Sequence, residues 1–132
     1  MNIPAKTEIL IGDVCAVLRT LPAEHFHCAV TSPPYWNLRD YGIEGQIGQE
    51  ATPELFIETL VGVFRELGRV LRSDGVLWVN LGDTYGGGTC GGRLMMPQRF
   101  ALAMQQDGWI LRQEIQWSKR SPMPESIAGW QW

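Results

Sequence analysis

Apolar positions recur along the chain at spacings that are typical of helices. The clearest pattern begins after Pro53. Its apolar residues lie mostly three or four positions apart, at Phe56, Leu60, Val63, Phe64, Leu67, Val70 and Leu71. This stripe predicts an amphipathic helix that buries one face. Thr52 is a suitable N-cap, Pro53 fits the first turn, and Ser73-Asp74-Gly75 should end the helix.

Two shorter helices and four strands are expected around this helix. Helical spacing predicts the helices at residues 14–21 and 97–106. Apolar or alternating segments predict the strands, at residues 8–12, 25–30, 76–81 and 109–117. Trp78 and Trp117 alternate with apolar residues in two of these strands, so we expect them in the core. Strands that alternate with helices favour a mostly parallel sheet, and the expected fold class is a three-layer α/β sandwich.

Three polar residues are predicted to lie at one edge of this sheet. Asp13, Ser32 and Asp83 follow three of the predicted strands. In parallel α/β sheets, ligands bind beyond the carboxyl ends of the strands. Asp13 is also a good N-cap for the helix after it, and Asp83 fits a turn. Both residues can therefore have a structural role or a ligand-binding role.

The composition fits one soluble globular domain. The chain has 132 residues, of which 45% are hydrophobic and 19% are charged. Its net charge of -3 argues against strong nucleic-acid affinity by this chain alone. The three cysteines, Cys15, Cys28 and Cys90, have no CxxC spacing, so neither a zinc site nor a disulfide framework is expected. No signal peptide or membrane-spanning run is visible, and the expected location is the cytoplasm.

The segment Thr31-Ser32-Pro33-Pro34-Tyr35-Trp36 follows the second predicted strand and has a stiff backbone. Each proline fixes its own φ, and the residue before each proline is pushed into an extended conformation. The directions of the carbonyl groups are therefore set in advance. Ser32 adds a hydroxyl that can accept or donate a hydrogen bond, and Tyr35 and Trp36 add flat aromatic surface.

Such a segment can activate the amino group of a nucleobase. The lone pair of that group is delocalised into the ring, so the nitrogen is a poor nucleophile. Two fixed acceptors, the Ser32 hydroxyl and the Pro33 carbonyl, would draw the nitrogen toward a tetrahedral geometry, with roughly 3 kcal/mol from each well-aimed group. The base must first flip out of the duplex. Tyr35 would then stack on it, contributing about 1–3 kcal/mol.

The run TSPPYW resembles motif IV of the DNA amino-methyltransferases, which use S-adenosyl-L-methionine to methylate exocyclic base nitrogens. Three more segments resemble the family in the expected order: GDVCAVLRTLP, FRELGRVLRSDGVLWVNLGDTY and GWILRQEIQWSKRSPMPES. In the family, serine before PPY is typical of cytosine-N4 enzymes and aspartate of adenine-N6 enzymes, whereas asparagine is common in protein-glutamine methyltransferases. The resemblance implies cytosine-N4 methylation of double-stranded DNA in restriction-modification, with adenine-N6 methylation as the alternative. Without the resemblance, TSPPYW could be an ordinary loop or a docking site for a proline-binding domain.

The resemblance also implies roles for single residues. The implied catalytic segment is Ser32, Pro33, Pro34 and Tyr35. The implied cofactor contacts are Asp13, Thr31 and Ser32. The implied contacts to the flipped base are Tyr35, Trp36 and Asp83. No metal ion is implied.

One family feature, a glycine-rich cofactor loop after a first strand, is not found in the sequence. The glycines at positions 86–88, 91 and 92 follow a different strand and lack the acidic residue expected further on, so they are interpreted as a mobile loop. By resemblance, the missing part carries two central strands of a Rossmann-like sheet. Residues 1–132 are therefore expected to be a partial methyltransferase domain with an exposed strand edge. Such a chain would be an inactive binding module or half of a split enzyme that needs a second polypeptide.

Overall fold

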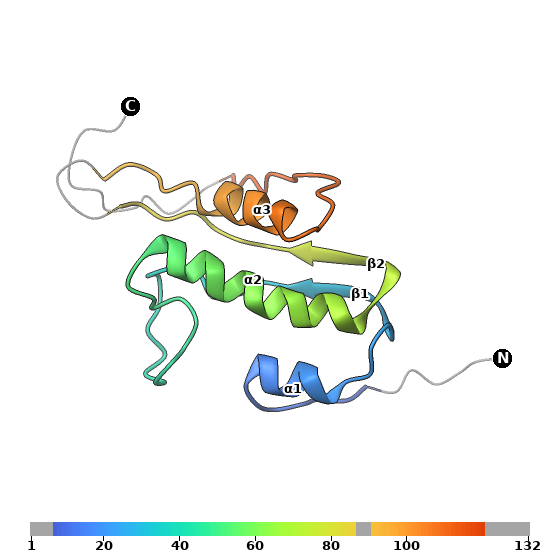
Figure 1. Cartoon of the computed structure of the whole chain (residues 1–132). Helices are drawn as coiled ribbons and strands as arrows, with labels where there is room; N and C mark the ends of the chain where they lie inside the picture. The colour runs from blue at the N-terminus through green and yellow to red at the C-terminus, as the bar shows by residue number, and fades with distance from the viewer. Residues whose placement is uncertain (1–6, 87–90, 121–132) are drawn as a thin grey trace. The chain divides into compact units, whose positions relative to one another are not determined.

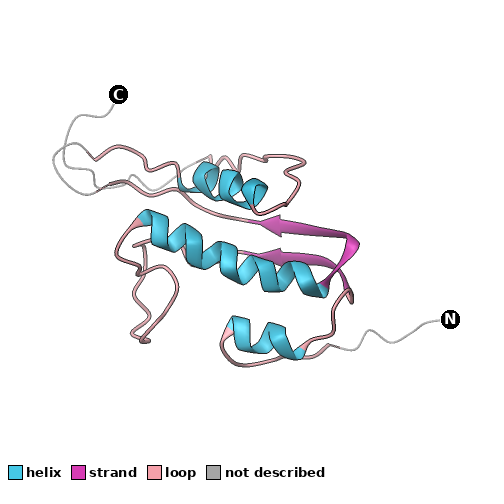
Figure 2. Ribbon diagram, in the orientation of Figure 1, coloured by secondary structure: helices cyan, strands magenta, loops and turns pink. Residues whose placement is uncertain are grey.

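The structure is a computed structural model that describes residues 7–86 and 91–120. Within these ranges, five elements follow one another (Figure 1): α1 (Val14–Thr20), β1 (Phe26–Thr31), α2 (Pro53–Val70), β2 (Leu71–Val79) and α3 (Met96–Gln106). The two strands pair directly and run in the same direction (Figure 2), with α2 as the crossover between them. This is the βαβ arrangement that parallel strands require. Within the described ranges, no helix combines the length and apolar character needed to cross a bilayer.

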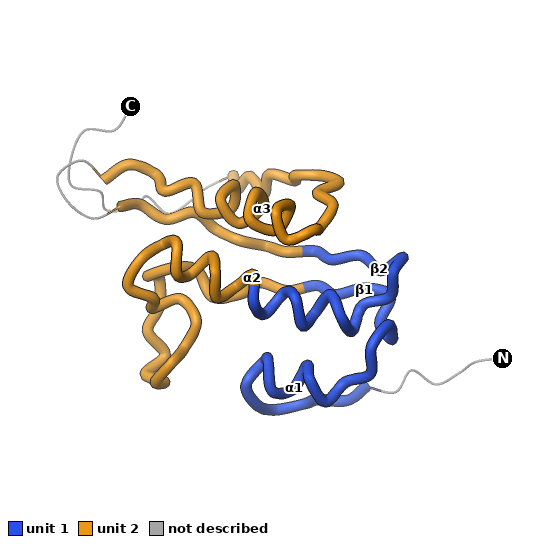
Figure 3. Tube along the Cα trace, viewed as in Figure 1, with its two compact units in different colours: residues 1–30, 62–78 blue, residues 31–61, 79–132 orange. Residues whose placement is uncertain are grey.

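The chain divides into two compact units (Figure 3). Unit 1 consists of Met1–Val30 and Gly62–Trp78, and unit 2 consists of Thr31–Val61 and Val79–Trp132. The boundary passes through α2 and the ends of both strands, so each unit contains about half of the long helix.

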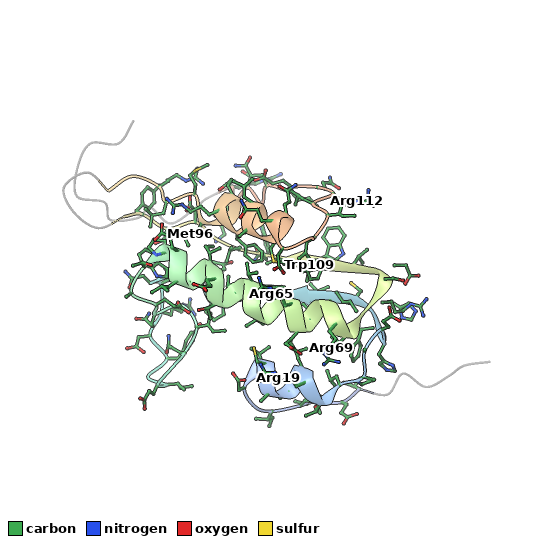
Figure 4. The ribbon with its side chains drawn as sticks, viewed as in Figure 1. Arg19, Arg65, Arg69, Met96, Trp109 and Arg112 are labelled. Carbon is green, nitrogen blue, oxygen red and sulfur yellow. The ribbon has the colours of Figure 1, made fainter. Side chains whose placement is uncertain are left out.

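Unit 1 is held together by the side chain of Arg69 near the C-terminal end of α2. Its guanidinium donates hydrogen bonds to the carbonyl oxygens of Leu18 at 2.7 Å and Leu21 at 3.1 Å. Both carbonyls lie at the C-terminal end of α1, where a cation is favoured by the helix dipole. Glu66, one turn earlier in α2, forms an ion pair with Arg69 at 3.2 Å. Figure 4 shows Arg69 on the side of α2 that faces α1.

Unit 2 has an apolar core made by the first half of α2 and by α3. The buried side chains from these two helices are Phe56, Ile57, Leu60, Val61, Met96, Phe100 and Met104. They lie at helical spacing, so each helix turns one apolar face inward. At the surface, Arg99 of α3 donates a hydrogen bond to Glu54 of α2 at 2.6 Å, which ties the two helices together.

The three predicted helices are confirmed, with one correction to a boundary. Thr52 caps α2 as expected, because its Oγ1 accepts a hydrogen bond from the amide of Leu55 at 3.2 Å. However, α2 ends at Val70, and Ser73-Asp74-Gly75 lies inside β2. The helix ends early because the Val70 carbonyl accepts a hydrogen bond from the amide of His25 at 2.9 Å, and the chain then pairs with β1.

Two of the four predicted strands are wrong. Residues 8–12 and 109–117 form no strand, and their apolar side chains are exposed, with Ile11 at 94% and Trp117 at 76%. A strand requires a partner for its backbone groups. In the part of the chain that the structure describes, the only sheet consists of β1 and β2. The core positions predicted for Trp78 and Trp117 are also wrong, because both side chains are more than half exposed. The α/β class is confirmed in this smaller form.

Candidate active site

The segment that follows β1 leaves the sheet at the carboxyl ends of both strands. The carbonyl oxygen of Thr31, the last residue of β1, accepts a hydrogen bond from the amide of Asn80 at 2.9 Å. Asn80 directly follows β2. This bond brings the chain that enters Ser32 next to the chain that leads to Gly82 and Asp83. The expected meeting of these two segments at one edge of the sheet is therefore observed within unit 2.

Ser32 and Tyr35 have their hydroxyl groups close together. The distance between Ser32 Oγ and Tyr35 Oη is 3.5 Å, and either oxygen can donate the hydrogen bond. The Ser32 side chain is exposed, whereas Pro33, Pro34 and Tyr35 are half-buried. The arrangement presents an accessible hydroxyl on a backbone that two prolines hold in place.

The Tyr35 ring lies directly against the backbone of Gly82. A Cβ atom added at Gly82 would lie 2.6 Å from Cε2 of the ring and 2.8 Å from Cδ2. At the backbone of the same segment, a Cβ added at Gly48 would lie 3.1 Å from the Tyr35 carbonyl oxygen and 3.2 Å from Pro34 Cβ. Two glycines therefore allow the chain to close tightly around the Pro34-Tyr35 step.

Trp36 closes the loop that follows. Its indole Nε1 donates a hydrogen bond to the carbonyl oxygen of Glu50 at 2.9 Å, and the indole is half-buried. The Glu50 carboxylate accepts a hydrogen bond from the amide of Gly48 at 2.9 Å, and the Gly48 carbonyl accepts one from the amide of Asn37 at 2.7 Å. The two ends of the loop at residues 37–49 are thus held together, and the polar edge of Trp36 is used for this purpose.

Asp83 organises the start of α3. Its Oδ1 accepts hydrogen bonds from the amides of Thr84 and Met96, both at 2.9 Å, and its Oδ2 accepts one from Arg93 Nε at 2.8 Å. Met96 is the first residue of α3 (Figure 4), so Asp83 acts as a long-range N-cap. The residue at the usual capping position, Met95, makes no side-chain cap and has a left-handed φ of 57°. The Asp83 carboxylate is largely removed from solvent, since its side chain is only 12% exposed.

The glycine-rich segment after Asp83 begins and ends in a short antiparallel pairing. Tyr85 and Arg93 form a β-bridge, and the amide of Gly86 donates to the carbonyl of Gly92 at 2.9 Å. Residues 87–90 of the predicted mobile loop lie outside the described residues. Arg93 had only the pattern of a scattered surface charge in the sequence, and the structure pairs it with Asp83.

Asp13 lies in unit 1, whereas the other predicted site residues lie in unit 2. It caps α1, because its Oδ1 accepts a hydrogen bond from the amide of Ala16 at 2.9 Å. Its second oxygen, Oδ2, has no partner among the described residues and can accept a hydrogen bond from a ligand hydroxyl. A free acceptor oxygen of this kind fits a ribose hydroxyl of an adenosine cofactor, and Asp13 fits a capping role alone equally well.

Metal-binding chemistry has no counterpart in residues 7–86 and 91–120, where no group of three or more His, Cys, Asp or Glu side chains could hold an ion. Cys15 and Cys28 are free thiols, and Cys90 lies outside the described residues. Sequence reasoning overlooked Gly48 and Gly82. The only sequence signal for Gly82 was its place between the end of β2 and Asp83, and a glycine before an aspartate is too common a pattern to be informative by itself.

Comparison with known proteins identifies relatives for most of the chain. A family model described as DNA methylase, of the N6 and N4 methyltransferase type, matches residues 26–129. The Type II methyltransferase M.XycI of Xanthomonas campestris pv. cyanopsidis is 44% identical over 88% of this chain, which corresponds to 47% of that protein. M.SmaI of Serratia marcescens, another Type II methyltransferase, is 42% identical over 91% of this chain and 50% of its own length. The chain therefore spans about half the length of these curated relatives.

Two solved structures share the fold. TTHA0409, a DNA modification methylase homologue from Thermus thermophilus, aligns with 74% of this chain and 39% of its own length, at a TM-score of 0.59 and 30% sequence identity. The cytosine-N4-specific PvuII DNA methyltransferase aligns with 74% of this chain and 32% of its own, at a TM-score of 0.57 and 21% identity. The second match supports the fold alone.

Proposed function

Because the chain belongs to the DNA amino-methyltransferase family, we propose that it forms the base-activating part of a Type II enzyme that methylates the exocyclic N4 of cytosine in DNA. The methyl donor in this proposal is S-adenosyl-L-methionine. The observation that carries the proposal is the exposed Ser32 hydroxyl, held 3.5 Å from Tyr35 Oη at the carboxyl end of β1. Ligands of parallel α/β sheets bind at this end.

The residues of the segment act on the amino group of a flipped base. Ser32 Oγ and the Pro33 carbonyl oxygen each accept a hydrogen bond from one N–H of this amino group, which localises the lone pair on the nitrogen. Tyr35 supports the base by stacking. The cofactor, when bound, supplies a methyl group on a sulfonium, so that the N–C bond forms as the C–S bond breaks. The nitrogen then loses one proton to solvent water, which restores a neutral methylamino group.

The cofactor side of the site involves Asp13, Thr31 and Ser32 in this proposal. Asp13 Oδ2 would accept a hydrogen bond from a ribose hydroxyl, since Oδ1 already accepts one from the amide of Ala16. The Thr31 carbonyl already accepts a hydrogen bond from the Asn80 amide, so we assign the cofactor contact of Thr31 to its side chain. Trp36 and Asp83 would line the base pocket. Their main contribution would be to hold its walls in place: Trp36 fixes the loop at residues 37–49, and Asp83 fixes the start of α3. We also place a Rossmann-like three-layer sandwich around this site, completed by a further part of the enzyme.

The experiment that tests this function identifies the methylated base. The chain is assayed alone and with a polypeptide that supplies the C-terminal half of M.XycI, using duplex DNA and radiolabelled cofactor. The DNA is then digested to nucleosides and analysed by mass spectrometry. We expect N4-methylcytosine. N6-methyladenine would support the alternative substrate, and the absence of any methylation in either mixture would contradict the proposal.

A second candidate function is that of a half-enzyme that binds cofactor only with a partner chain. It is favoured by the match to about half of each relative's length and by the exposed apolar side chains of the strands. Calorimetry distinguishes the two. Binding of S-adenosyl-L-methionine by the purified chain would contradict a requirement for a partner, whereas binding restored only by the second polypeptide would support it.

A further inference from the structure

We propose that Gly82 is a positioning residue for Tyr35: the absence of a side chain at position 82 determines where the tyrosine ring lies and keeps its hydroxyl beside Ser32. This inference rests on the proposed function, because the position of the ring matters only if Tyr35 supports a base. The steric part of the inference is independent of activity and can be tested separately.

The contact at Gly82 is too close for any other residue. A Cβ atom at this position would lie 2.6 Å from Cε2, 2.8 Å from Cδ2 and 3.3 Å from Cζ of the Tyr35 ring. Two of these distances are below 3.0 Å, a separation that real Cβ atoms essentially never show. A methyl group at position 82 must therefore force a shift, and the atoms that it meets belong to the Tyr35 ring.

Space, and not backbone conformation, explains the glycine at this position. Among the residues that the structure describes, the glycines with a positive φ are Gly12, Gly42, Gly45, Gly48 and Gly108, and Gly82 is not among them. An alanine could therefore adopt the Gly82 backbone conformation without strain. The three atoms nearest to a Cβ at position 82 all belong to the Tyr35 ring, so Gly82→Ala acts first on the room available to that ring, whereas the same substitution at Gly48, with a φ of 104°, would also strain the backbone.

The backbone of the Pro34-Tyr35 step has little room to shift in response. Gly48 packs against the Pro34 side chain and the Tyr35 carbonyl, and it is fixed there by its hydrogen bonds to Asn37 and Glu50. The proline before Tyr35 restricts the backbone further. The response must therefore be a rotation of the ring, which moves Oη away from Ser32 Oγ.

A rotated ring would misplace both the aromatic surface and the hydroxyl that touches Ser32. Misplacement of a reacting group by about 1 Å can reduce a rate by roughly 10²-fold. We therefore expect Gly82→Ala to lower kcat for methyl transfer by roughly tenfold to a hundredfold while KM for the cofactor stays within a factor of about two. A general loss of folded protein would also lower the apparent kcat. It would not, however, shift the fluorine NMR resonance of Tyr35 in the protein that remains folded.

Fluorine NMR tests the steric part without any activity. The chain has three tyrosines, which can be labelled as 3-fluorotyrosine and assigned by Tyr→Phe substitution. Gly82→Ala should shift the Tyr35 resonance and leave that of Tyr41 unchanged. The matched control is Gly62→Ala, because a Cβ at Gly62 meets nothing within 4 Å. An unchanged Tyr35 resonance in Gly82→Ala would overturn the inference.

A double-mutant cycle tests whether Gly82 acts through Tyr35. In the Tyr35→Ala background the ring is absent, so Gly82→Ala should cause no further loss of methyl transfer. Additive losses would overturn the inference. If Gly82→Ala alone fails to fold, the double variant decides: recovery of folding on removal of the ring supports the inference, and continued unfolding contradicts it. If no variant methylates DNA but the Tyr35 resonance moves, the proposed function fails while the steric role of Gly82 stands.

Discussion

Ser32 is the residue at which the chemistry of the site is most concentrated. Its hydroxyl is exposed and lies 3.5 Å from Tyr35 Oη, so it can reach a ligand without breaking a buried contact. The residue is not needed for packing, since its side chain is not part of the buried core. A substitution at Ser32 should therefore affect the reaction far more than the fold.

We predict that Ser32→Ala lowers kcat for methyl transfer by roughly a hundredfold, because one of two fixed acceptors for the amino group is lost. Its thermal unfolding midpoint should remain that of the wild type. Ser73→Ala, which removes an exposed hydroxyl from β2, is the matched control and should leave both quantities unchanged. Equal activity of Ser32→Ala and wild type would contradict the role of the hydroxyl.

Asp83 shows the opposite balance between fold and chemistry. Its two oxygens accept three hydrogen bonds from the chain itself, and its side chain is 12% exposed. Asp83→Asn would turn an N–H group toward Arg93, because an amide has one acceptor oxygen only. We predict a decrease of about 1–3 kcal/mol in the free energy of unfolding, measured by urea denaturation.

The control for Asp83 is Asp74→Asn, which breaks the exposed ion pair with Arg72. This change should have a much smaller effect on unfolding, since exposed ion pairs contribute little. Should the two variants unfold alike, the structural importance assigned to the Asp83 network would be wrong. A loss of methylation in Asp83→Asn beyond its loss of folded protein would indicate an additional role in base binding.

At the scale of elements, α2 and α3 are joined by a contact that depends on pH. Glu54 lies in the first turn of α2, where a backbone hydrogen bond and the guanidinium of Arg99 lower the pKa of its carboxyl. Because the pKa is lower in the folded state than in the unfolded chain, the carboxylate form of Glu54 stabilises the folded state. The resulting stabilisation is complete above the pKa of the unfolded chain and is lost as the pH falls through the lower pKa of the folded state.

We therefore predict that Glu54→Gln lowers the unfolding midpoint at neutral pH and that this difference disappears once the pH falls below the lowered pKa of Glu54 in the folded state. Thermal denaturation monitored by circular dichroism across a pH series measures the effect. Glu58→Gln, an exposed change on the same helix, is the control and should show no such trend. A difference that persists in acid would rule out the charge as its cause.

At the scale of the whole molecule, the strands leave large apolar side chains uncovered. Val76 and Trp78 are two positions apart in β2 and therefore share one face of the strand, where each is 52% exposed. Val30 of β1 is 77% exposed. All three belong to unit 1. Contiguous apolar surface of this kind promotes association. Relatives of about twice the length have additional residues that could cover such a surface.

We predict that the purified chain self-associates and that Trp78→Lys shifts it toward the monomer, because a charge on this apolar face opposes its burial in a contact. Sedimentation velocity over a range of concentrations measures this shift. Leu55→Lys is the control, since Leu55 is similarly exposed, at 47%, but lies on a helix. A purely monomeric wild-type chain would contradict the prediction.

The helices, β1 and the stiff backbone of the TSPPYW segment follow from local patterns in the sequence. The apolar stripe of α2, its Thr52 cap and the Asp13 cap of α1 each depend on residues within one or two helical turns. Such features can be read from the sequence because the interacting groups are neighbours along the chain. The same is true of the stiffness of the two prolines.

The tertiary structure alone decided which apolar segments became strands and which residues surround Tyr35. Residues 8–12 and 109–117 have strand-like patterns, yet neither finds a pairing partner in the described chain, since pairing depends on residues remote in sequence. Gly82 likewise meets a residue 47 positions away, Tyr35. Two of the three hydrogen bonds of Asp83 join residues 10 and 13 positions apart, and only the bond to Thr84 is local. A glycine or an aspartate has no local pattern that reveals such a partner, because only the folded chain brings the two together.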